Sequence, residues 1–148
     1  MAKKLETDFE DAGDSPGLML WRVTNAWQAS IRAALRPFDL THVQFVLLAA
    51  LTWLDAETPI TQRDLAEYAR TDPMMTSQVI RTLESKKLVE RRPHPTDARA
   101  RSVVVTQAGA ALAGKANRAV EASDREFFAA LGDRQAAFVA MLGMLDRK

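Results

Sequence analysis

Apolar side chains recur every three or four residues along most of this chain, and that spacing is typical of amphipathic helices. It predicts two long helices at residues 18–36 and 107–131. A third helix at residues 42–54, with Thr41 as its predicted N-cap, is apolar on nearly all sides and is therefore expected to be buried. Gly132 interrupts the pattern, and Asp133 is the predicted N-cap of a last helix.

Two shorter helices are predicted between residues 61 and 85, separated by a tight break at Arg70 and Thr71. Thr61 is a suitable N-cap for the first of them. Asp72 caps the second, and Pro73 follows at the first helical position, where the backbone N–H has no partner in any case. The second helix has a mainly apolar face made of Met75, Thr76, Val79, Ile80 and Leu83. Its opposite face carries short side chains and one long cation, and consists of Met74, Ser77, Gln78, Arg81 and Ser85.

Strand-like segments follow at residues 88–92 and 101–106. The segment between them, residues 93–100, is too rich in proline for a helix and is basic near its tip. Ile60 is expected to add one short bridge to this two-stranded sheet. The order helix, turn, helix, hairpin is the outline of a winged helix-turn-helix, which places one helix in a DNA groove.

Charge in this region favours nucleic acid. Residues 77–101 contain seven basic and three acidic side chains, a surplus of four, whereas the whole chain has a net charge of only +1. The basic residues are Arg81, Lys86, Lys87, Arg91, Arg92, Arg99 and Arg101, and the acidic ones are Glu84, Glu90 and Asp97. Basic charge is thus concentrated where phosphates would lie. The polar face of the second helix, taken alone, also fits a plain amphipathic helix facing solvent.

The segments MTSQVIRTLE and LVERRPHPTDARARSVVVTQAG closely resemble the MarR family of bacterial winged-helix transcription regulators. The most specific parts are Asp97-x-Arg99 and Thr106-x-x-Gly109, and the resemblance covers most of the chain. It implies a dimeric repressor or activator whose recognition helix begins at Asp72. One departure is visible, because Lys87 stands where the family usually has a glycine. Glycine suits a left-handed helix end, so Lys87 must either adopt that conformation under strain or end the helix differently.

Roles at DNA are predicted for the basic and polar residues named in the next three sentences. Ser77, Gln78 and Arg81 are expected to read bases in the major groove, with Met74 on the same face. Arg99 is expected to enter the minor groove, while an ion pair between Asp97 and Arg101 stiffens the wing. Thr61, Gln62 and Thr71 are expected to meet phosphates, and Lys86, Arg91 and Arg92 to add longer-range attraction.

The predicted fold is mainly α: a winged helix-turn-helix with a small β wing and a helical dimerisation bundle. Residues 1–14 form a flexible tail, and residues 15–148 form one MarR-type domain. Within it, residues 15–38 and 107–148 are the dimerisation helices, and residues 41–106 are the winged helix DNA-binding unit. An isologous homodimer would set its recognition helices about 34–36 Å apart, so the operator should be an inverted repeat.

The resemblance also implies a pocket for small aromatic or phenolic effectors between the dimerisation helices and the DNA-binding unit. Trp21, Asn25, His42 and Phe45 are the candidate pocket residues by position. Ligand binding there would shift the spacing of the recognition helices and release DNA. The three tryptophans of the chain fit core and dimer packing equally well.

Several classes of protein are disfavoured. The chain has no cysteine and only two histidines, which argues against thiol chemistry and metal sites, and no cofactor is expected. No nucleophile–base pair or phosphate loop indicates an enzyme. No signal peptide or membrane span is predicted, so we expect a soluble cytoplasmic protein. A winged helix used for protein–protein contacts, which would not need the basic wing, and a constitutive DNA-binding regulator without a ligand remain open.

Overall fold

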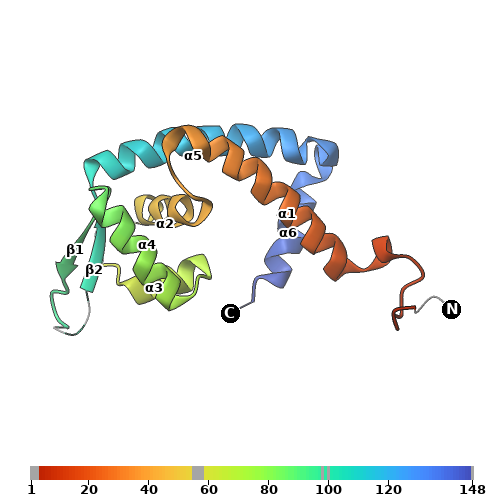
Figure 1. The fold of residues 1–148 in the computed structure, drawn as a ribbon, viewed down its shortest axis with the longest axis horizontal. Coiled ribbons are helices and arrows are strands. Elements are labelled where there is room, and N and C mark those ends of the chain that lie inside the picture. Colours follow the sequence, from red (N-terminus) through yellow and green to blue (C-terminus); the bar gives the residue numbers. More distant parts are fainter. Residues whose placement is uncertain (1–3, 55–58, 98, 100, 148) are drawn as a thin grey trace.

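The computed structural model describes residues 4–54, 59–97, 99 and 101–147 of the chain. It is mainly helical, with one two-stranded antiparallel sheet. The helices and strands are α1 (Pro16–Leu35), α2 (His42–Trp53), α3 (Gln62–Ala69), α4 (Pro73–Ser85), β1 (Val89–Pro93), β2 (Arg101–Val105), α5 (Gln107–Phe128) and α6 (Gln135–Leu145). Figure 1 shows α2, α3, α4, β1 and β2, together called the reading head below, under one end of the long helix α5. The first half of α1 and α6 lie toward the other end of α5. The predicted fold class is confirmed.

Most of the predicted helix starts carry the expected caps. The hydroxyls of Thr41 and Thr61 each accept a backbone N–H three residues ahead, and Gln44 and Asp64 return the bond to the cap residue's own N–H. The carboxylate of Asp72 accepts the N–H of Met75 at 2.9 Å. These contacts satisfy donors that a helix start otherwise leaves unpaired.

The predicted cap at Asp133 is wrong. A 3-10 segment, Ala129–Arg134, follows α5, which ends at Phe128 rather than at residue 131. Gly132 turns the chain inside that segment with φ 55° and ψ −127°. Asp133 therefore lies within the corner, and the N-cap of α6 is Arg134, which makes no side-chain cap bond.

The core is built around α2, which packs against α1 and α5 on one side and against α3 and α4 on the other. Leu47 and Leu48 of α2 are fully buried, as are Ile31, Leu65, Ile80 and Leu83 of its neighbours. The prediction of a buried second helix is confirmed. On α4, Thr76, Ile80 and Leu83 face this core, but Met75 is 40% exposed and lies at the margin of the apolar face.

The wing pairs β1 with β2 in antiparallel register, from Val89 opposite Val105 to Pro93 opposite Arg101. A third chain segment joins it, because the N–H of Val103 donates to the carbonyl of Ile60 at 2.7 Å and Thr61 forms a bridge with Ser102. The bridge expected at Ile60 is therefore present. It ties the start of α3 to the wing.

Lys87 ends α4 in the left-handed conformation, with φ 62°. Its N–H donates to the carbonyl of Glu84 at 2.9 Å, and the N–H of Leu88 donates to the carbonyl of Leu83 at 2.9 Å. This pair of bonds is the Schellman motif, and the buried Leu83 and Leu88 provide its apolar contact. Of the two possibilities for Lys87, the chain adopts the left-handed one.

The start of α5 meets the end of α4 at one junction. Thr106 caps α5 by accepting the N–H of Gly109 at 3.0 Å, and its hydroxyl donates to the carbonyl of Lys87 at 2.8 Å. Its N–H donates to the carbonyl of Leu88 at 3.0 Å. A Cβ atom on Gly109 would stand 2.0 Å from the Leu88 carbonyl oxygen, so only glycine allows this approach. The Thr106-x-x-Gly109 motif thus joins α5 to the end of α4 and the start of the wing.

The left-handed Lys87 generates a stability prediction. Lys87→Gly should raise the free energy of unfolding by about 1 kcal/mol, because glycine adopts positive φ without the steric cost that a side chain carries. Urea denaturation of both proteins measures the difference. Lys87→Ala removes the same side chain but keeps the Cβ, so it should give no such gain; an equal gain in both variants would contradict the explanation.

Candidate nucleic-acid interface

The helix-turn-helix is closed by backbone and hydroxyl contacts at residues 70–76. Arg70 ends α3 in the left-handed conformation, and the N–H of Thr71 donates to the carbonyl of Ala66 at 3.0 Å. The buried hydroxyl of Thr76 donates to the carbonyl of Asp72 at 2.8 Å and lies 2.7 Å from the hydroxyl of Thr71. Because the hydrogen of Thr76 is used, Thr71 is the donor in that second bond. These bonds fix the angle between α3 and α4.

The outer face of α4 has the composition and exposure that the sequence predicted. Gln78 and Arg81 are exposed, Ser77 is half-buried, and Met74 is 77% exposed. None of the ion pairs among the described residues involves Arg81. The guanidinium of Arg81 is therefore available to an external acceptor such as a base or a phosphate.

The three residues expected to meet phosphates differ in what they offer. Thr61 accepts the N–H of Asp64 and keeps its hydroxyl hydrogen for another partner. Gln62 is half-buried, and its side-chain oxygen is buried without a hydrogen-bond partner in the described part of the chain. Thr71 has used its hydrogen on Thr76, so its side chain has none left to donate to a phosphate.

The tip of the wing is shaped by side chains that accept backbone N–H groups. The Nδ1 atom of His94 accepts the N–H groups of Thr96 and Asp97 at 3.2 and 3.1 Å. The carboxylate of Asp97 accepts the N–H of Arg99 at 3.0 Å. The sequence did not point to His94, because the side chains that usually signal such turns are those of Asp, Asn, Ser and Thr.

The predicted ion pair between Asp97 and Arg101 is wrong. Neither residue takes part in the ion pairs found among the described residues. Asp97 instead turns its carboxylate to the backbone of Arg99, two residues ahead, where a short acidic side chain reaches a turn N–H more readily than the start of β2. The side chain of Arg99 is exposed at the wing tip.

Three of the basic residues counted in the sequence are engaged within the protein. Lys86 donates to the carbonyl of Asp39 at 2.7 Å and lies 3.6 Å from its carboxylate. Arg92 pairs with Glu90 at 3.0 Å. Arg91 turns back toward α4, where it contacts Glu84 and the carbonyl of Ser77. The basic residues of this region that take part in no ion pair among the described residues are Arg81, Lys87, Arg99 and Arg101, and all four are exposed.

The profile of the MarR family matches residues 40–100 of the chain, which include α2, the helix-turn-helix and the first strand of the wing, β1. An uncharacterised HTH-type transcriptional regulator from Bacillus subtilis, YdcH, is 42% identical over 123 residues, which are 82% of this chain and 84% of that protein. The chain belongs to the MarR family. It is a winged helix DNA-binding transcription regulator by this membership and fold.

Other MarR-family proteins extend the comparison. The HTH-type transcriptional repressor Rv2887 of Mycobacterium tuberculosis is 33% identical over 137 residues, 90% of this chain and 96% of that protein. Its structure with salicylic acid superposes with a TM-score of 0.70 over 92% of this chain and 98% of that one, at 31% identity. A repressor bound to a 23-mer DNA duplex, CouR, shares the fold with a TM-score of 0.84 at 23% identity, over 97% and 100% of the two chains.

The four candidate pocket residues lie on two helices with different environments. Trp21 is 69% exposed on α1, and the amide of Asn25 donates to the Trp21 carbonyl at 2.7 Å. On α2, Phe45 is buried in the core, and the ring of His42 meets that of Trp27 edge-on at 5.1 Å. The indole N–H of Trp27 donates to Asp124 of α5 at 2.8 Å. His42 thus belongs to a polar cluster where α1, α2 and α5 meet.

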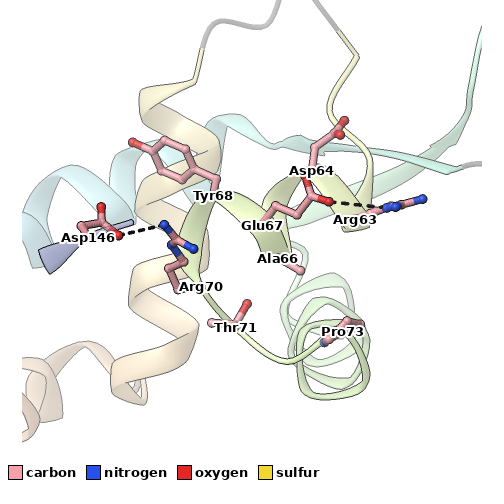
Figure 2. A pocket seen from close by; sticks show the side chains of 9 residues that line it. All are labelled: Arg63, Asp64, Ala66, Glu67, Tyr68, Arg70, Thr71, Pro73 and Asp146. Atoms are coloured by element: carbon pink, nitrogen blue, oxygen red, sulfur yellow. Dashed lines mark ion pairs between the residues drawn. The ribbon is translucent and has the colours of Figure 1, made fainter. Parts of the chain in front are cut away.

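A hollow lies elsewhere, beside the end of α3. Figure 2 shows its lining, with dashed ion pairs from Arg63 to Glu67 and from Arg70 to Asp146. Arg70 also donates to the carbonyl of Arg147. The hollow has a volume of about 1010 Å³, and none of the four candidate residues lines it. At this hollow, Arg70 in the turn of the helix-turn-helix contacts Asp146 and Arg147, which follow α6.

His42 generates a prediction for pH. Burial lowers its pKa below the ordinary 6.5, and the charge of Arg32 lowers it further, while Asp124 acts in the opposite direction. The folded protein therefore binds fewer protons at this site than the unfolded chain, and the stability that this site contributes is lost as the pH falls below about 6.5. Urea denaturation at about pH 7.5 and 5.5 measures this loss.

The control is His42→Gln, which cannot take up a proton in this range. The wild-type protein should lose more free energy of unfolding on acidification than this variant does. An identical loss in both proteins would show that His42 does not carry the effect.

Proposed function

We propose that the chain is a cytoplasmic homodimeric repressor that binds an inverted-repeat promoter site. The observation that carries this proposal is the joint exposure of Arg81 on the outer face of α4 and Arg99 at the wing tip. An arginine on a recognition helix suits guanine in the major groove, and an arginine on a wing suits the narrow minor groove. Ser77 and Gln78 add base contacts, with Met74 beside them, and Thr61 and Gln62 add phosphate contacts.

A second copy of the chain is the partner that fits the uncovered apolar surface. α6 contains no buried residue, although Val139, Met141, Leu142, Met144 and Leu145 are all apolar. The first half of α1 exposes Leu18, Leu20, Trp21 and Val23 at the same end of the molecule (Figure 1). Uncovered apolar faces of this extent mark protein contacts. A two-fold dimer through these helices would present two recognition helices to one face of the duplex.

The same apolar stretch does not suit a membrane span. Residues 107–145 are long and apolar enough to cross a membrane, by length and composition alone. However, Gly132 breaks the helix, and α6 has 11 residues, about 17 Å, against a hydrocarbon core of about 30 Å. A protein partner accounts for the apolar surface without straightening this corner.

The effector part of the proposal is a small aromatic or phenolic compound that releases DNA. Its support is the salicylic acid complex of Rv2887, and its candidate contacts are Trp21 and Asn25 of α1 with His42 and Phe45 of α2. A ligand that favours one spacing of the recognition helices shifts the dimer toward that state. Titration of salicylate into the protein–DNA complex tests this part separately from DNA binding.

The DNA-binding prediction concerns Arg99. Duplexes enriched by the wild-type protein from a random library are first identified, and binding to them is then titrated with salt. Arg99→Ala should weaken binding and lower the slope of log affinity against log salt by about one unit per bound protomer, because one cation is lost from each. The matched control, Arg118→Ala, removes an exposed arginine from α5 and should leave the slope unchanged.

Two results would contradict the proposal in different ways. An unaltered slope in Arg99→Ala would show that the wing does not reach DNA. If the wild-type protein enriches no duplex and binds none with a steep salt dependence, a protein-interaction role of the winged helix would replace the DNA-binding one.

The dimer prediction concerns α6. Val139→Asp should convert a dimer into a monomer in sedimentation velocity and lower operator affinity, since a carboxylate would have to be buried against the partner. Gln135→Asp introduces the same charge at the polar start of the same helix and should leave the dimer intact. A wild-type protein that sediments as a monomer would overturn this part of the proposal.

A further inference from the structure

A contact between β1 and α4 joins the wing directly to the recognition helix. The backbone N–H of Arg91 donates to the carboxylate of Glu84 at 3.2 Å. The Nη2 atom of Arg91 donates to the carbonyl of Ser77 at 3.4 Å, and its Nε atom lies 4.0 Å from the other oxygen of Glu84. The contact therefore spans two turns of α4, from Ser77 to Glu84.

The side chain of Arg91 is largely removed from solvent. It is only 18% exposed, and its Nε atom is buried without a hydrogen-bond partner in the described part of the chain. Arg92, the next residue on the same strand, has a side chain that is 61% exposed and pairs with Glu90 on the surface. A cation that neutralises phosphate needs the exposure that Arg92 has and Arg91 lacks.

We infer that Arg91 is a positioning residue that acts through α4, with Glu84 as its partner, and not a phosphate contact. This inference rests on the proposed DNA-binding function. The bond to the Ser77 carbonyl is made on the stretch of helix expected to read bases, and β1 leads directly to the wing tip. Arg91 and Glu84 thereby set the angle between the helix in the major groove and the wing in the minor groove.

The geometry of DNA makes this angle matter. The two grooves lie at fixed distances along a duplex, so a reading head that enters both must hold its helix and wing in one arrangement. The Lys87 corner links these elements over the short connection between Ser85 and Val89, with Leu83 and Leu88 as its apolar contact. The Arg91 contact adds a second link, which reaches from Glu84 in the last turn of α4 to Ser77 about two turns before it and resists rotation of the wing about that corner.

The conservative variant separates the two roles of Arg91. Lysine keeps the charge and would serve as a phosphate contact, but it lacks the planar fork that reaches both Ser77 and Glu84. Arg91→Lys should therefore lower the preference for the selected duplex over random duplex by about tenfold, while the salt slope stays unchanged. Arg92→Lys is the matched control, with the same change on an exposed neighbour, and should keep the wild-type preference.

Glu84→Ala tests the partner in a double-mutant cycle. If the two side chains act as one unit, Glu84→Ala and Arg91→Lys combined should lose about as much preference as either single variant. Additive losses would show that the two residues act independently and would overturn the pairing. A wild-type preference in Arg91→Lys, together with a lower slope in Arg91→Gln, would establish a phosphate contact and overturn the inference.

A DNA-free measurement distinguishes failure of this inference from failure of the DNA-binding proposal. Because the chain has no cysteine, spin labels can be placed at Thr82→Cys and Pro95→Cys without removing native thiols. The distance distribution between the labels should be narrow in the otherwise wild-type protein and broader in Arg91→Lys, with Arg92→Lys again as control. Equal widths in the wild-type and Arg91→Lys backgrounds would overturn the inference even if no duplex is bound.

Discussion

The packing of Gly109 on the Leu88 carbonyl is the contact on which the rest of the arrangement depends. A side chain at position 109 would collide with the backbone, so this approach fixes where α5 starts relative to the wing. Thr106 completes the junction by bonding to Lys87, Leu88 and Gly109 at once. The end of α4, the wing and the start of α5 therefore meet within a few residues. A shift of any one of them must be transmitted to the other two, because no free loop intervenes.

The electrostatics of the reading head depend on which of its basic side chains pair with acidic ones within the protein. Acidic side chains hold Lys86 and Arg91 against the protein, while Arg92 pairs with Glu90 on the surface. Arg81 and Arg99 remain directed outward, one on each of the two elements that would enter a groove. Local net charge, four, therefore equals the number of basic residues in this region without an ion pair among the described residues, but it does not identify them. The distribution of paired and unpaired cations is more informative, because a paired arginine has already spent part of its hydrogen-bonding capacity.

The sequence predicted the elements and their order because periodicity and caps are local properties, and Thr41, Thr61 and Asp72 all act as expected. Side-chain contacts between residues that neither periodicity nor capping relates were harder to predict. The prediction that Asp133 caps α6 was wrong because the bend at Gly132 leaves Asp133 inside the corner, so that α6 starts one residue later, after Arg134. The pair of Asp97 and Arg101 failed because a backbone N–H lay nearer. Glu84 gave no sequence signal, since its partner, Arg91, lies in a different element, β1, seven residues further on.

The length of α5 gives the junction a mechanical meaning. This helix has 22 residues and is about 33 Å long, with the reading head at one end and the corner to α6 at the other (Figure 1). Rigid rotation by about 5° about one end displaces the other by about 3 Å, close to the rise of about 3.4 Å per base pair. A rotation of about 5° at one end of α5 therefore moves the other end by about one base-pair step. A rotation too small to disturb the packing at one end is thus enough to displace the reading head by one base pair along a duplex.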